Sequence, residues 1–315
     1  MPRILVIKPS SLGDIVHGLQ VVAALKEQVA GVHVTWVVRE IFAPLVSACT
    51  AVDEVIVFQR KQGLRGLRAV MGELGALTFD VVVDFQGLLR SGLMTWSAHA
   101  PRKLGRSDSR EGAGFFYGER SPLPAGGRNS HALEILLQFA PLLGGRATLG
   151  SPLTFRPAAE FTGADFFNSG AAAPVVMFPE SRRPEKCWPG FSALTARMLQ
   201  ADSEVRIVWS GSERLNDGGA FSAERFLNLT GRTALEVMPQ LIGRAGAVIA
   251  NDSGPMHLAA ALGKRTLAIF GPTAPELFGP YPLSCPRHHV VRAPGGDLAR
   301  LTPQVVLQAW QAQGI

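Results

Sequence analysis

The chain has 315 residues, of which 47% are hydrophobic and 18% charged, and this is the composition of a compact globular protein rather than a disordered or fibrous one. No stretch reaches the ~20 uninterrupted apolar residues that span a bilayer, no leader sequence is evident, and the three widely spaced cysteines argue against a disulfide framework and a zinc site. We therefore expect a cytoplasmic protein, and its formal net charge of +6 hints at an acidic partner.

The first half of the chain alternates apolar runs with helical patterns. Strands are predicted at residues 4–7, 33–38, 55–58 and 81–85, with helices at 15–29 and 64–77. This βαβ rhythm predicts a mostly parallel sheet. A stretch rich in Gly, Pro, Ala and Thr follows at 144–174, contains one short helical candidate at 164–168, and is expected to join two domains.

The second half repeats this rhythm. Strands are predicted at 175–178, 205–210, 247–250 and 266–270, with helices at 190–200, 234–244 and 256–262. A last helix is expected at 302–313, with Thr302 as its N-cap and Pro303 in its first turn. The patterns predict two doubly wound α/β domains, residues 1–160 and 161–300, followed by a C-terminal helix within 301–315.

The turn after the first strand, Lys8-Pro-Ser-Ser-Leu-Gly-Asp14, is the first candidate for chemistry. It contains no G-x-G-x-x-G, so a dinucleotide dehydrogenase loses its main support. Asp14 is either the N-cap of the following helix or a general base that reaches an acceptor hydroxyl, with Gly13 allowing close approach. The backbone amides of Ser10 and Ser11 offer an alternative phosphate site. An anion fits poorly beside a carboxylate, which favours the base.

A second polar segment, Asn251-Asp-Ser-Gly-Pro-Met-His257, follows a strand and opens a helix. The amides of Ser253 and Gly254 at the positive helix end are a ready site for a diphosphate, although such a short run in isolation is often only a cap. His257 either binds a phosphate or hydroxyl or packs against its own helix. The same choice between orienting a functional group and packing applies to His17 in the first helix.

A polar loop at residues 178–189 follows the first strand of the second half. It offers Ser181, Arg182 and Lys186 to phosphate oxygens, although exposed cations of this kind usually face solvent.

Taken together, these motifs resemble the bacterial ADP-heptose:lipopolysaccharide heptosyltransferases, which form glycosyltransferase family nine. The run from Asn251 to Thr273 is the strongest part of the signature, and Lys186-Cys-Trp-Pro189 adds to it. Further matching segments are Asp84-Phe-Gln-Gly-Leu-Leu-Arg-Ser91, Arg106, Arg110-Glu111, Phe116-Tyr117 and His131. The resemblance spans almost the whole chain. Within the family the chain is most similar to heptosyltransferase I, which adds the first L-glycero-D-manno-heptose to the Kdo sugars of the lipopolysaccharide inner core.

The resemblance implies a GT-B fold, in which two Rossmann-like domains face a central cleft. It also implies an ADP-heptose donor, inversion at the anomeric carbon, no catalytic metal and no cofactor, with Asp14 as the general base. The implied donor-binding residues are Ser181, Lys186, Glu213, Asp252, Ser253, Gly254, Met256 and His257. The implied acceptor-binding residues are Ser10, Ser11, Gly13, Arg60, Lys61, Gln86, Arg90 and Arg110. Glu213, the candidate ribose ligand, is otherwise a surface acid.

Residues 57–128 hold most of the charge excess, with eleven Lys and Arg against six Asp and Glu. A solvated surface is the simplest explanation for any one of these charges. The implied acceptor, Kdo-lipid A, carries carboxylates and phosphates that such cations recognise. The same cations favour peripheral association with the cytoplasmic face of the inner membrane. No nucleic-acid partner or obligate protein partner is expected.

Two alternatives remain open at this stage. One is a related transferase that acts on a protein or small-molecule acceptor. The other is a non-catalytic nucleotide-sugar-binding protein, and Asp14 and Lys186 both count against it because a binding module does not need a carboxylate at the acceptor hydroxyl.

Overall fold

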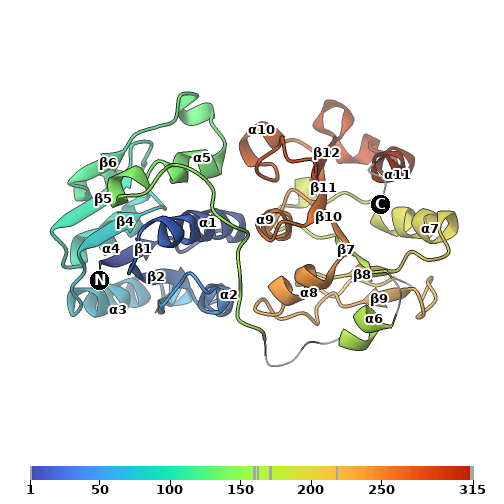
Figure 1. The fold of residues 1–315 in the computed structure, drawn as a ribbon, viewed down its shortest axis with the longest axis horizontal. Helices are drawn as coiled ribbons and strands as arrows, with labels where there is room; N and C mark the ends of the chain where they lie inside the picture. The colour runs from blue at the N-terminus through green and yellow to red at the C-terminus, as the bar shows by residue number, and fades with distance from the viewer. Residues whose placement is uncertain (1, 159–160, 162, 170–171, 218, 313–315) are drawn as a thin grey trace. The chain divides into compact units, whose positions relative to one another are not determined.

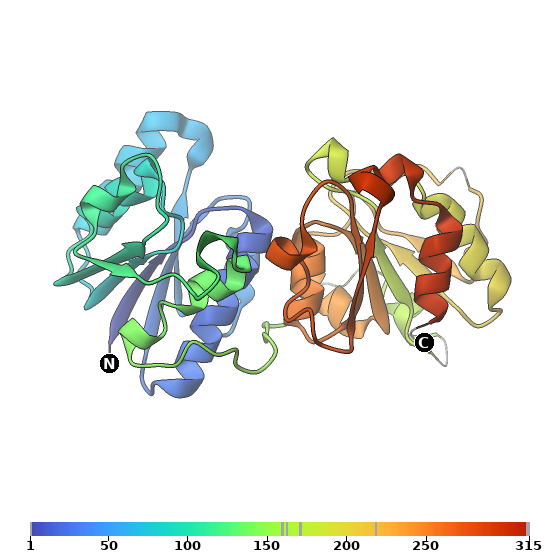
Figure 2. The ribbon, with the colours of Figure 1, turned by 90° about the horizontal axis from the view of Figure 1, so that it is seen from above.

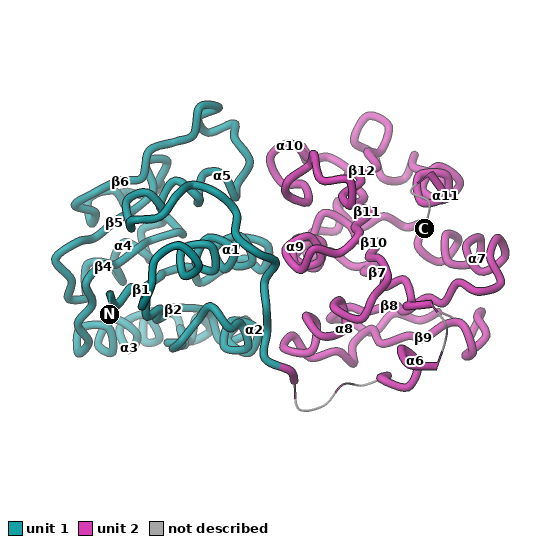
Figure 3. The backbone as a smooth tube through the Cα atoms, viewed as in Figure 1, with its two compact units in different colours: residues 1–156 teal, residues 157–315 magenta. Residues whose placement is uncertain are grey.

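The computed structural model describes residues 2–158, 161, 163–169, 172–217 and 219–312. Residue 160, at the predicted domain boundary, and residues 313–315, at the end of the predicted last helix, lie outside the described residues. The chain divides into two compact units, residues 1–156 and residues 157–315 (Figure 3). Each unit is an α/β structure built around one parallel sheet.

Unit 1 contains six strands with helices between them (Figure 1). The strands are β1 (Arg3–Ile7), β2 (His33–Arg39), β3 (Glu54–Phe58), β4 (Val81–Asp84), β5 (Arg102–Arg106) and β6 (Glu119–Ser121). The α-helices are α1 (Leu12–Gln28), α2 (Ala43–Ala48), α3 (Gly63–Gly75), α4 (Leu89–Ser97) and α5 (Ala132–Leu137). Short 3-10 turns are η1 (Arg60–Gln62), η2 (Ala113–Phe116), η3 (Gly127–Asn129) and η4 (Pro141–Leu143). The strand order is β3-β2-β1-β4-β5-β6, and every neighbouring pair is parallel.

Unit 2 has the same architecture. Its strands are β7 (Val175–Phe178), β8 (Ile207–Trp209), β9 (Phe226–Asn228), β10 (Ala247–Asn251), β11 (Arg265–Phe270) and β12 (His288–Arg292). Its α-helices are α6 (Ala164–Asn168), α7 (Phe191–Ala201), α8 (Met238–Arg244), α9 (Gly254–Ala261), α10 (Pro275–Phe278) and α11 (Pro303–Gln311). Short 3-10 turns are η5 (Pro184–Lys186), η6 (Pro294–Gly296) and η7 (Leu298–Arg300). The parallel strands follow the order β12-β11-β10-β7-β8-β9.

Both sheets reverse their strand order at one point, between β1 and β4 in unit 1 and between β7 and β10 in unit 2. This order confirms the prediction of two doubly wound domains, and helices cover both faces of each sheet (Figures 1 and 2). In open α/β sheets, ligands bind beyond the carboxyl ends of the strands at such a switch point. The loops after β1, β4, β7 and β10 are therefore the first places to look for a site.

Buried apolar side chains explain why these elements pack. In unit 1, Leu67, Val70 and Leu74 of α3 and Met94 of α4 pack with Leu5, Ile7, Val37 and Val82 of the sheet. In unit 2, a second cluster joins the sheet to α7 and α11, and the buried Trp188 donates its indole N–H to the Leu301 carbonyl at 2.9 Å. Each unit therefore has its own hydrophobic core.

The helix after β1 differs from the sequence prediction at its start. It begins at Leu12, three residues before the predicted start, and Ser11 rather than Asp14 is the N-cap. Ser11 has the extended backbone of an N-cap (φ −90°, ψ −177°), whereas Asp14 lies inside the first turn as the third helical residue. Asp14 is therefore not the N-cap, because the helix starts before it, but its carboxylate accepts the Ser11 backbone N–H in a capping box and so does satisfy an amide at the start of its own helix.

Candidate active site

The switch point of unit 1 brings together a buried lysine and the predicted base. Lys8 follows β1 and is only 2% exposed, and its ammonium Nζ lies 3.8 Å from the Asp14 carboxylate and 3.4 Å from the Phe85 carbonyl. The Asp14 carboxylate accepts the Ser11 backbone N–H at 3.0 Å and the Ser11 hydroxyl at 2.6 Å. The Asp14 side chain remains 43% exposed. Lys8 and Ser11 thus hold the Asp14 carboxylate in place, and the rest of its surface is open to solvent.

The charge state of this pair follows from its surroundings. Burial alone raises the pKa of Asp14, but the Lys8 ammonium, the two Ser11 hydrogen bonds and His17 outweigh it and hold that pKa well below its ordinary value. Burial lowers the pKa of Lys8, and Asp14 opposes this effect. Asp14 is therefore an ionised carboxylate over the physiological pH range, ready to accept a hydrogen bond.

The amides proposed as an alternative phosphate site are already engaged. The Ser11 N–H is donated to Asp14, and the Ser10 N–H is donated to the side-chain oxygen of Gln86 at 3.4 Å. Gln86 belongs to the loop after β4, so this contact ties together the two loops of the switch point. Because both amides are engaged, the arrangement favours a role for the Asp14 carboxylate in this turn over the binding of a phosphate. Gly13 lies in the first turn of α1, half-buried.

The loop after β4 is organised by a fully buried carboxylate. Asp84 accepts the amides of Gln86 and Gly87 at 2.8 and 3.0 Å and the phenol of Tyr117 at 2.7 Å. Burial raises the pKa of Asp84 more than these hydrogen bonds lower it. Gly87 has a φ of +71°, a conformation that favours glycine. Beside this loop, Arg106 forms a two-pronged pair with Asp108 at 2.8 and 2.7 Å.

The predicted acceptor cations lie at the same edge of the unit 1 sheet, because all its strands run parallel. Arg60 and Lys61 follow β3, Arg90 opens α4 after β4, and Arg110 follows β5 and donates its backbone N–H to the Gly87 carbonyl at 2.9 Å. All four side chains are exposed. Gln86 and Ser10 are in contact with each other. β3 lies two strands away from β1, so Arg60 and Lys61 lie about 10 Å along the sheet edge from the loop after β1.

His17 and His131 pack against each other behind the switch point, with ring centroids 5.5 Å apart in an edge-on arrangement. Both are buried. The Nδ1 atom of His131 accepts the Leu133 N–H at 3.1 Å and so caps α5. His17 lies one turn after Asp14 on α1, packs against His131 and helps to lower the pKa of Asp14, while its role in orienting that carboxylate stays a prediction.

The switch point of unit 2 also holds a cation and a carboxylate. The ammonium of Lys186, in the loop after β7, lies 2.6 Å from Asp252, which follows β10. Asp252 is only 5% exposed and also accepts the Thr273 hydroxyl at 2.5 Å. Sequence analysis placed Lys186 and Asp252 in the donor site separately, and the structure brings them into direct contact.

Asn251 fixes the geometry around this pair. Its side-chain oxygen accepts the Trp188 backbone N–H at 3.1 Å, and its side-chain nitrogen donates to the Pro179 carbonyl at 2.8 Å. Both ends of the loop that carries Lys186 are thereby tied to the end of β10. Sequence analysis gave Asn251 no role of its own. Its position as the first residue of the Asn251–His257 motif, directly after a strand, could have indicated one.

The predicted phosphate-binding helix end is present. Ser253 is the N-cap of α9, with an extended backbone, and Gly254 is the first helical residue. The Ser253 hydroxyl donates to the Asn251 carbonyl at 3.2 Å. Met256 and His257 are buried within the same helix, at 0% and 8% exposure. The positive end of α9 therefore lies directly after Asp252.

The other predicted donor residues occupy loops at the same edge of unit 2. The Ser181 amide donates to the Cys187 sulfur at 3.2 Å. Glu180, which sequence analysis did not single out, accepts the amides of Ser212 and Glu213 at 2.8 and 2.9 Å. The Glu213 side chain is exposed beyond β8. Glu180 therefore links the loop after β7 to the loop that carries Glu213.

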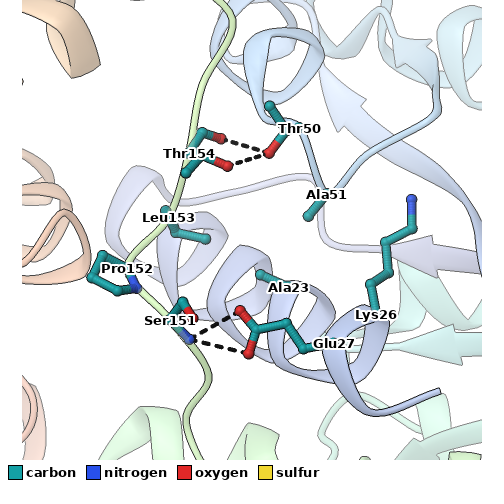
Figure 4. A pocket seen from close by; sticks show the side chains of 9 residues that line it. All are labelled: Ala23, Lys26, Glu27, Thr50, Ala51, Ser151, Pro152, Leu153 and Thr154. Carbon is teal, nitrogen blue, oxygen red and sulfur yellow. Dashed lines mark hydrogen bonds between the residues drawn. The ribbon is translucent and has the colours of Figure 1, made fainter. Parts of the chain in front are cut away.

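Two of the cavities among the described residues contain neither Asp14 nor Lys186. The first, of about 340 Å³, lies at the amino edge of the unit 1 sheet. There Glu27 accepts the Ser151 N–H at 3.0 Å, and the Thr50 hydroxyl donates to the Thr154 carbonyl at 3.1 Å (Figure 4). The second, of about 550 Å³, lies beyond β8 and β9 of unit 2. It is lined by Arg214, Leu215, Asn216, Asp217, Leu227, Asn228, Thr230 and Arg232.

Among the described residues there is no group of three or more His, Cys, Asp or Glu arranged to hold a metal ion. A search of the same residues for a helix long and apolar enough to cross a bilayer also found none.

Comparison with known proteins gives consistent matches. Residues 67–292 match the model of glycosyltransferase family 9 (heptosyltransferase). Lipopolysaccharide heptosyltransferase 1 of Escherichia coli O18:K1:H7 is 29% identical over 331 residues, covering 97% of this chain and 96% of that protein. The structure of E. coli heptosyltransferase WaaC with ADP superposes with a TM-score of 0.80, 28% identity and 99% coverage of both chains. The same enzyme with ADP-2-deoxy-2-fluoro heptose gives 0.77 and 27%, covering 98% of this chain and 99% of that one. These matches confirm the predicted GT-B class with two Rossmann-like units.

Proposed function

The chain belongs to glycosyltransferase family 9, and we propose that it transfers L-glycero-D-manno-heptose from ADP-heptose to the Kdo region of the lipopolysaccharide inner core. The relative named lipopolysaccharide heptosyltransferase 1 supports this acceptor, and the similar structures with ADP and with a fluorinated ADP-heptose support this donor. One observation carries the proposal for this chain: the switch point of each unit holds a lysine paired with a carboxylate, Lys8 with Asp14 and Lys186 with Asp252.

The donor diphosphate binds in unit 2. The diphosphate oxygens accept hydrogen bonds from the Lys186 ammonium and from the backbone N–H groups at the start of α9, where Ser253 and Gly254 lie. Asp252, which also accepts the Thr273 hydroxyl, holds the Lys186 ammonium in place, so the cation does not have to be ordered when the donor arrives. These groups also stabilise the negative charge that develops on the leaving ADP. Ser181, Glu213, Met256 and His257 complete this donor site.

The acceptor is activated in unit 1. The acceptor oxygen attacks the anomeric carbon as the bond from that carbon to the β-phosphate oxygen breaks, and the hydroxyl proton passes to Asp14. One displacement of this kind inverts the anomeric configuration and needs no enzymic nucleophile. The low pKa of Asp14 keeps the base ionised, and proton transfer follows as the attacking hydroxyl becomes more acidic during bond formation.

The acceptor charges bind along the carboxyl edge of unit 1. Arg60, Lys61, Arg90 and Arg110 are exposed there, and the carboxylates of Kdo and the phosphates of lipid A are their partners by charge-assisted hydrogen bonds. Ser10, Ser11, Gly13 and Gln86 line the acceptor hydroxyl beside Asp14. The lipid part of this acceptor requires the enzyme to work at the membrane surface as a peripheral protein on the cytoplasmic face.

The Asp14→Asn variant tests this mechanism because it removes the base while keeping the shape of the side chain. We expect turnover to fall by roughly 10²–10⁴-fold. Binding of ADP-heptose, measured by calorimetry, stays within about twofold of the unchanged protein because the donor site lies in the other unit. Unchanged turnover would exclude Asp14 as the base, and loss of both binding and turnover would indicate a structural role.

A further inference from the structure

One face of unit 1 combines exposed apolar side chains with unpaired cations. Helices α3 and α4 cover the same side of the unit 1 sheet, and Figure 3 shows them on the side away from α1 and α5. The turn η2 packs against α4, where a Cβ added to Gly92 would lie only 2.6 Å from the Phe116 ring. The outer surfaces of α3, α4 and η2 therefore form one continuous layer.

Four large apolar side chains project from this layer. Phe115 of η2 is 92% exposed, Leu64 of α3 72%, Trp96 of α4 63% and Leu89 of α4 44%. Leu89 and Trp96 are seven residues apart, which is two helical turns, so they share one stripe of α4. We call Leu64, Leu89, Trp96 and Phe115 the apolar face of unit 1. Scattered single apolar residues need no explanation, but four of this size on one layer do.

Four arginines lie on or beside the elements that carry the apolar face. Arg65 and Arg68 are exposed on α3, Arg90 is the second residue of α4, and Arg120 donates to the Gly114 carbonyl at 3.0 Å beside Phe115. In the part of the chain that the structure describes, none of these arginines forms an ion pair.

Two of the four nearby acids are paired with cations other than these four arginines. Glu119 pairs with Arg102 at 2.8 Å and Asp108 with Arg106 at 2.7 Å. Glu111 accepts the Leu89 amide at 3.3 Å, and Glu73 is exposed on α3. The apolar face thus carries a net positive rim.

We infer that the apolar face of unit 1 docks onto an anionic phospholipid bilayer, with Trp96 and Phe115 inserted among the lipid headgroups and the surrounding arginines bound to lipid phosphates. Aromatic side chains prefer the headgroup region, and cations beside it are attracted by anionic lipid. A second copy of this chain is a poorer partner, because two positive rims would repel each other. This inference deepens the proposed membrane location but does not depend on heptose transfer, since bilayer binding needs neither donor nor acceptor.

Tryptophan fluorescence tests the insertion directly. Of the five tryptophans, all of them described, Trp36, Trp188, Trp209 and Trp310 are at most 6% exposed and only Trp96 is open to solvent. With vesicles of phosphatidylglycerol and phosphatidylethanolamine that contain no lipid A, we expect brominated lipid chains to quench the emission of the full-length protein. The Trp96→Phe variant should lose this quenching, whereas vesicles of phosphatidylcholine should give none with either protein. Binding without Trp96 quenching, or no binding to the anionic vesicles, overturns the inference.

Substitutions separate insertion from charge. The double variant Phe115→Ser with Trp96→Ser should lower the partition coefficient onto anionic vesicles by at least tenfold, because it removes the two aromatic anchors. The double variant Arg65→Glu with Arg68→Glu should lower it by at least about fivefold for each cation removed. Phe278→Ser is the matched control, because Phe278 is 42% exposed but belongs to unit 2, and its partition should not change.

Measurements of turnover and of oligomeric state complete the test of the apolar face. All these variants should keep full turnover on a deacylated, water-soluble acceptor, and those of the apolar face should lose turnover on acceptor embedded in vesicles. If the wild-type protein instead forms a dimer that Phe115→Ser disrupts, the face is an interface between copies and the inference is wrong. Failure of the proposed function would appear as absent turnover with vesicle binding intact, so the two failures are distinguishable.

Discussion

At the scale of single residues, the switch point of each unit holds one lysine–carboxylate pair. Sequence analysis found three of the four groups, Asp14, Lys186 and Asp252, because each lies in a recognisable polar segment after a strand. It did not assign a role to Lys8, since a lysine at the end of an apolar strand is usually solvated. Lys8 lies one residue beyond β1 at the switch point, and this position beside a predicted site is the signal that was missed.

Replacing Lys8 should change the pH dependence of the reaction. Asp14 must be ionised to act as a base, so kcat/KM falls as the pH drops through the pKa of Asp14. Lys8 lowers that pKa, and in the Lys8→Met variant we expect the acid limb of the kcat/KM profile to move to higher pH. Lys26→Met is the control, because Lys26 pairs with Asp53 at the other edge of the sheet. Acid limbs that superimpose for all three proteins would refute the coupling.

The lowered pKa of Asp14 also affects the free energy of unfolding. Because the pKa of Asp14 is lowered on folding, its contribution to the free energy of unfolding is present above the unfolded value of about 3.9 and is lost as the pH falls through the folded value. The side chain is 43% exposed, so the contribution is modest.

Replacing Lys186 should weaken donor binding and leave the acceptor side unaffected. The Lys186→Met variant removes the proposed charge-assisted contact to the donor diphosphate, and we expect the Kd for ADP to rise roughly 10- to 100-fold. Arg183→Met lies in the same loop and removes only an exposed pair with Glu185, so its Kd should change less than about twofold. Calorimetry with ADP measures both, and equal effects would mean that loop charge in general, not Lys186, binds the diphosphate.

At the scale of elements, periodicity predicted the long helices and the central strands of both sheets. It missed α2, α4, α5, α10, β5, β6, β9 and β12, which are short or polar. β5, for example, reads Arg-Lys-Leu-Gly-Arg and has no apolar run, and it is a strand because β4 and β6 pair with it on either side. Such elements exist through tertiary pairing, which a single sequence does not display.

The loop after β4 shows the same limit. Sequence analysis matched Asp84 and Tyr117 to the family but could not pair them, because they are thirty-three positions apart and meet only in the folded sheet. Their contact depends on Gly105 of β5, whose place under the Tyr117 ring leaves no room for a side chain.

A Gly105→Ala substitution should therefore destabilise unit 1. The added Cβ would lie 2.1 Å from the Tyr117 ring, so the ring must move and the hydrogen bond to the buried Asp84 is lost. We expect a loss of about 2–3 kcal/mol in the free energy of unfolding. Gly72→Ala on α3 is the control, because no atom lies within 4 Å of its added Cβ, and it should stabilise the helix by up to about 1 kcal/mol. Denaturant unfolding distinguishes the two, and equal effects would contradict the packing argument.

At the scale of the whole molecule, the chain consists of two units of the same topology, and we propose that the acceptor binds to unit 1 and the donor to unit 2. The fold class was predictable from the sequence, because the alternation of elements appears in both halves, whereas the division of the two substrates between the units stays a prediction. The ties that join loops within each unit, such as Asn251 to Trp188 and Gln86 to Ser10, were not predictable, because they link residues far apart in the chain.

This division predicts separable kinetic effects. The double variant Arg90→Glu with Arg110→Glu should raise the KM for a Kdo-containing acceptor at least tenfold, because it replaces attraction to the acceptor charges with repulsion. The Kd for ADP should remain within about twofold. Arg287→Glu, an exposed position on unit 2, is the control for net charge. If the control raises the acceptor KM equally, the effect is one of overall charge and the proposed acceptor residues are wrong.

The most direct test of the central claim is the release of ADP from the purified protein given ADP-heptose and deacylated Kdo-lipid A, in the presence of EDTA and with the acceptor omitted in parallel. We predict ADP release that depends on the acceptor, persists in EDTA and disappears in the Asp14→Asn variant. Absence of release from a protein that binds ADP-heptose, or release that is equally fast without the acceptor, would contradict heptose transfer to Kdo.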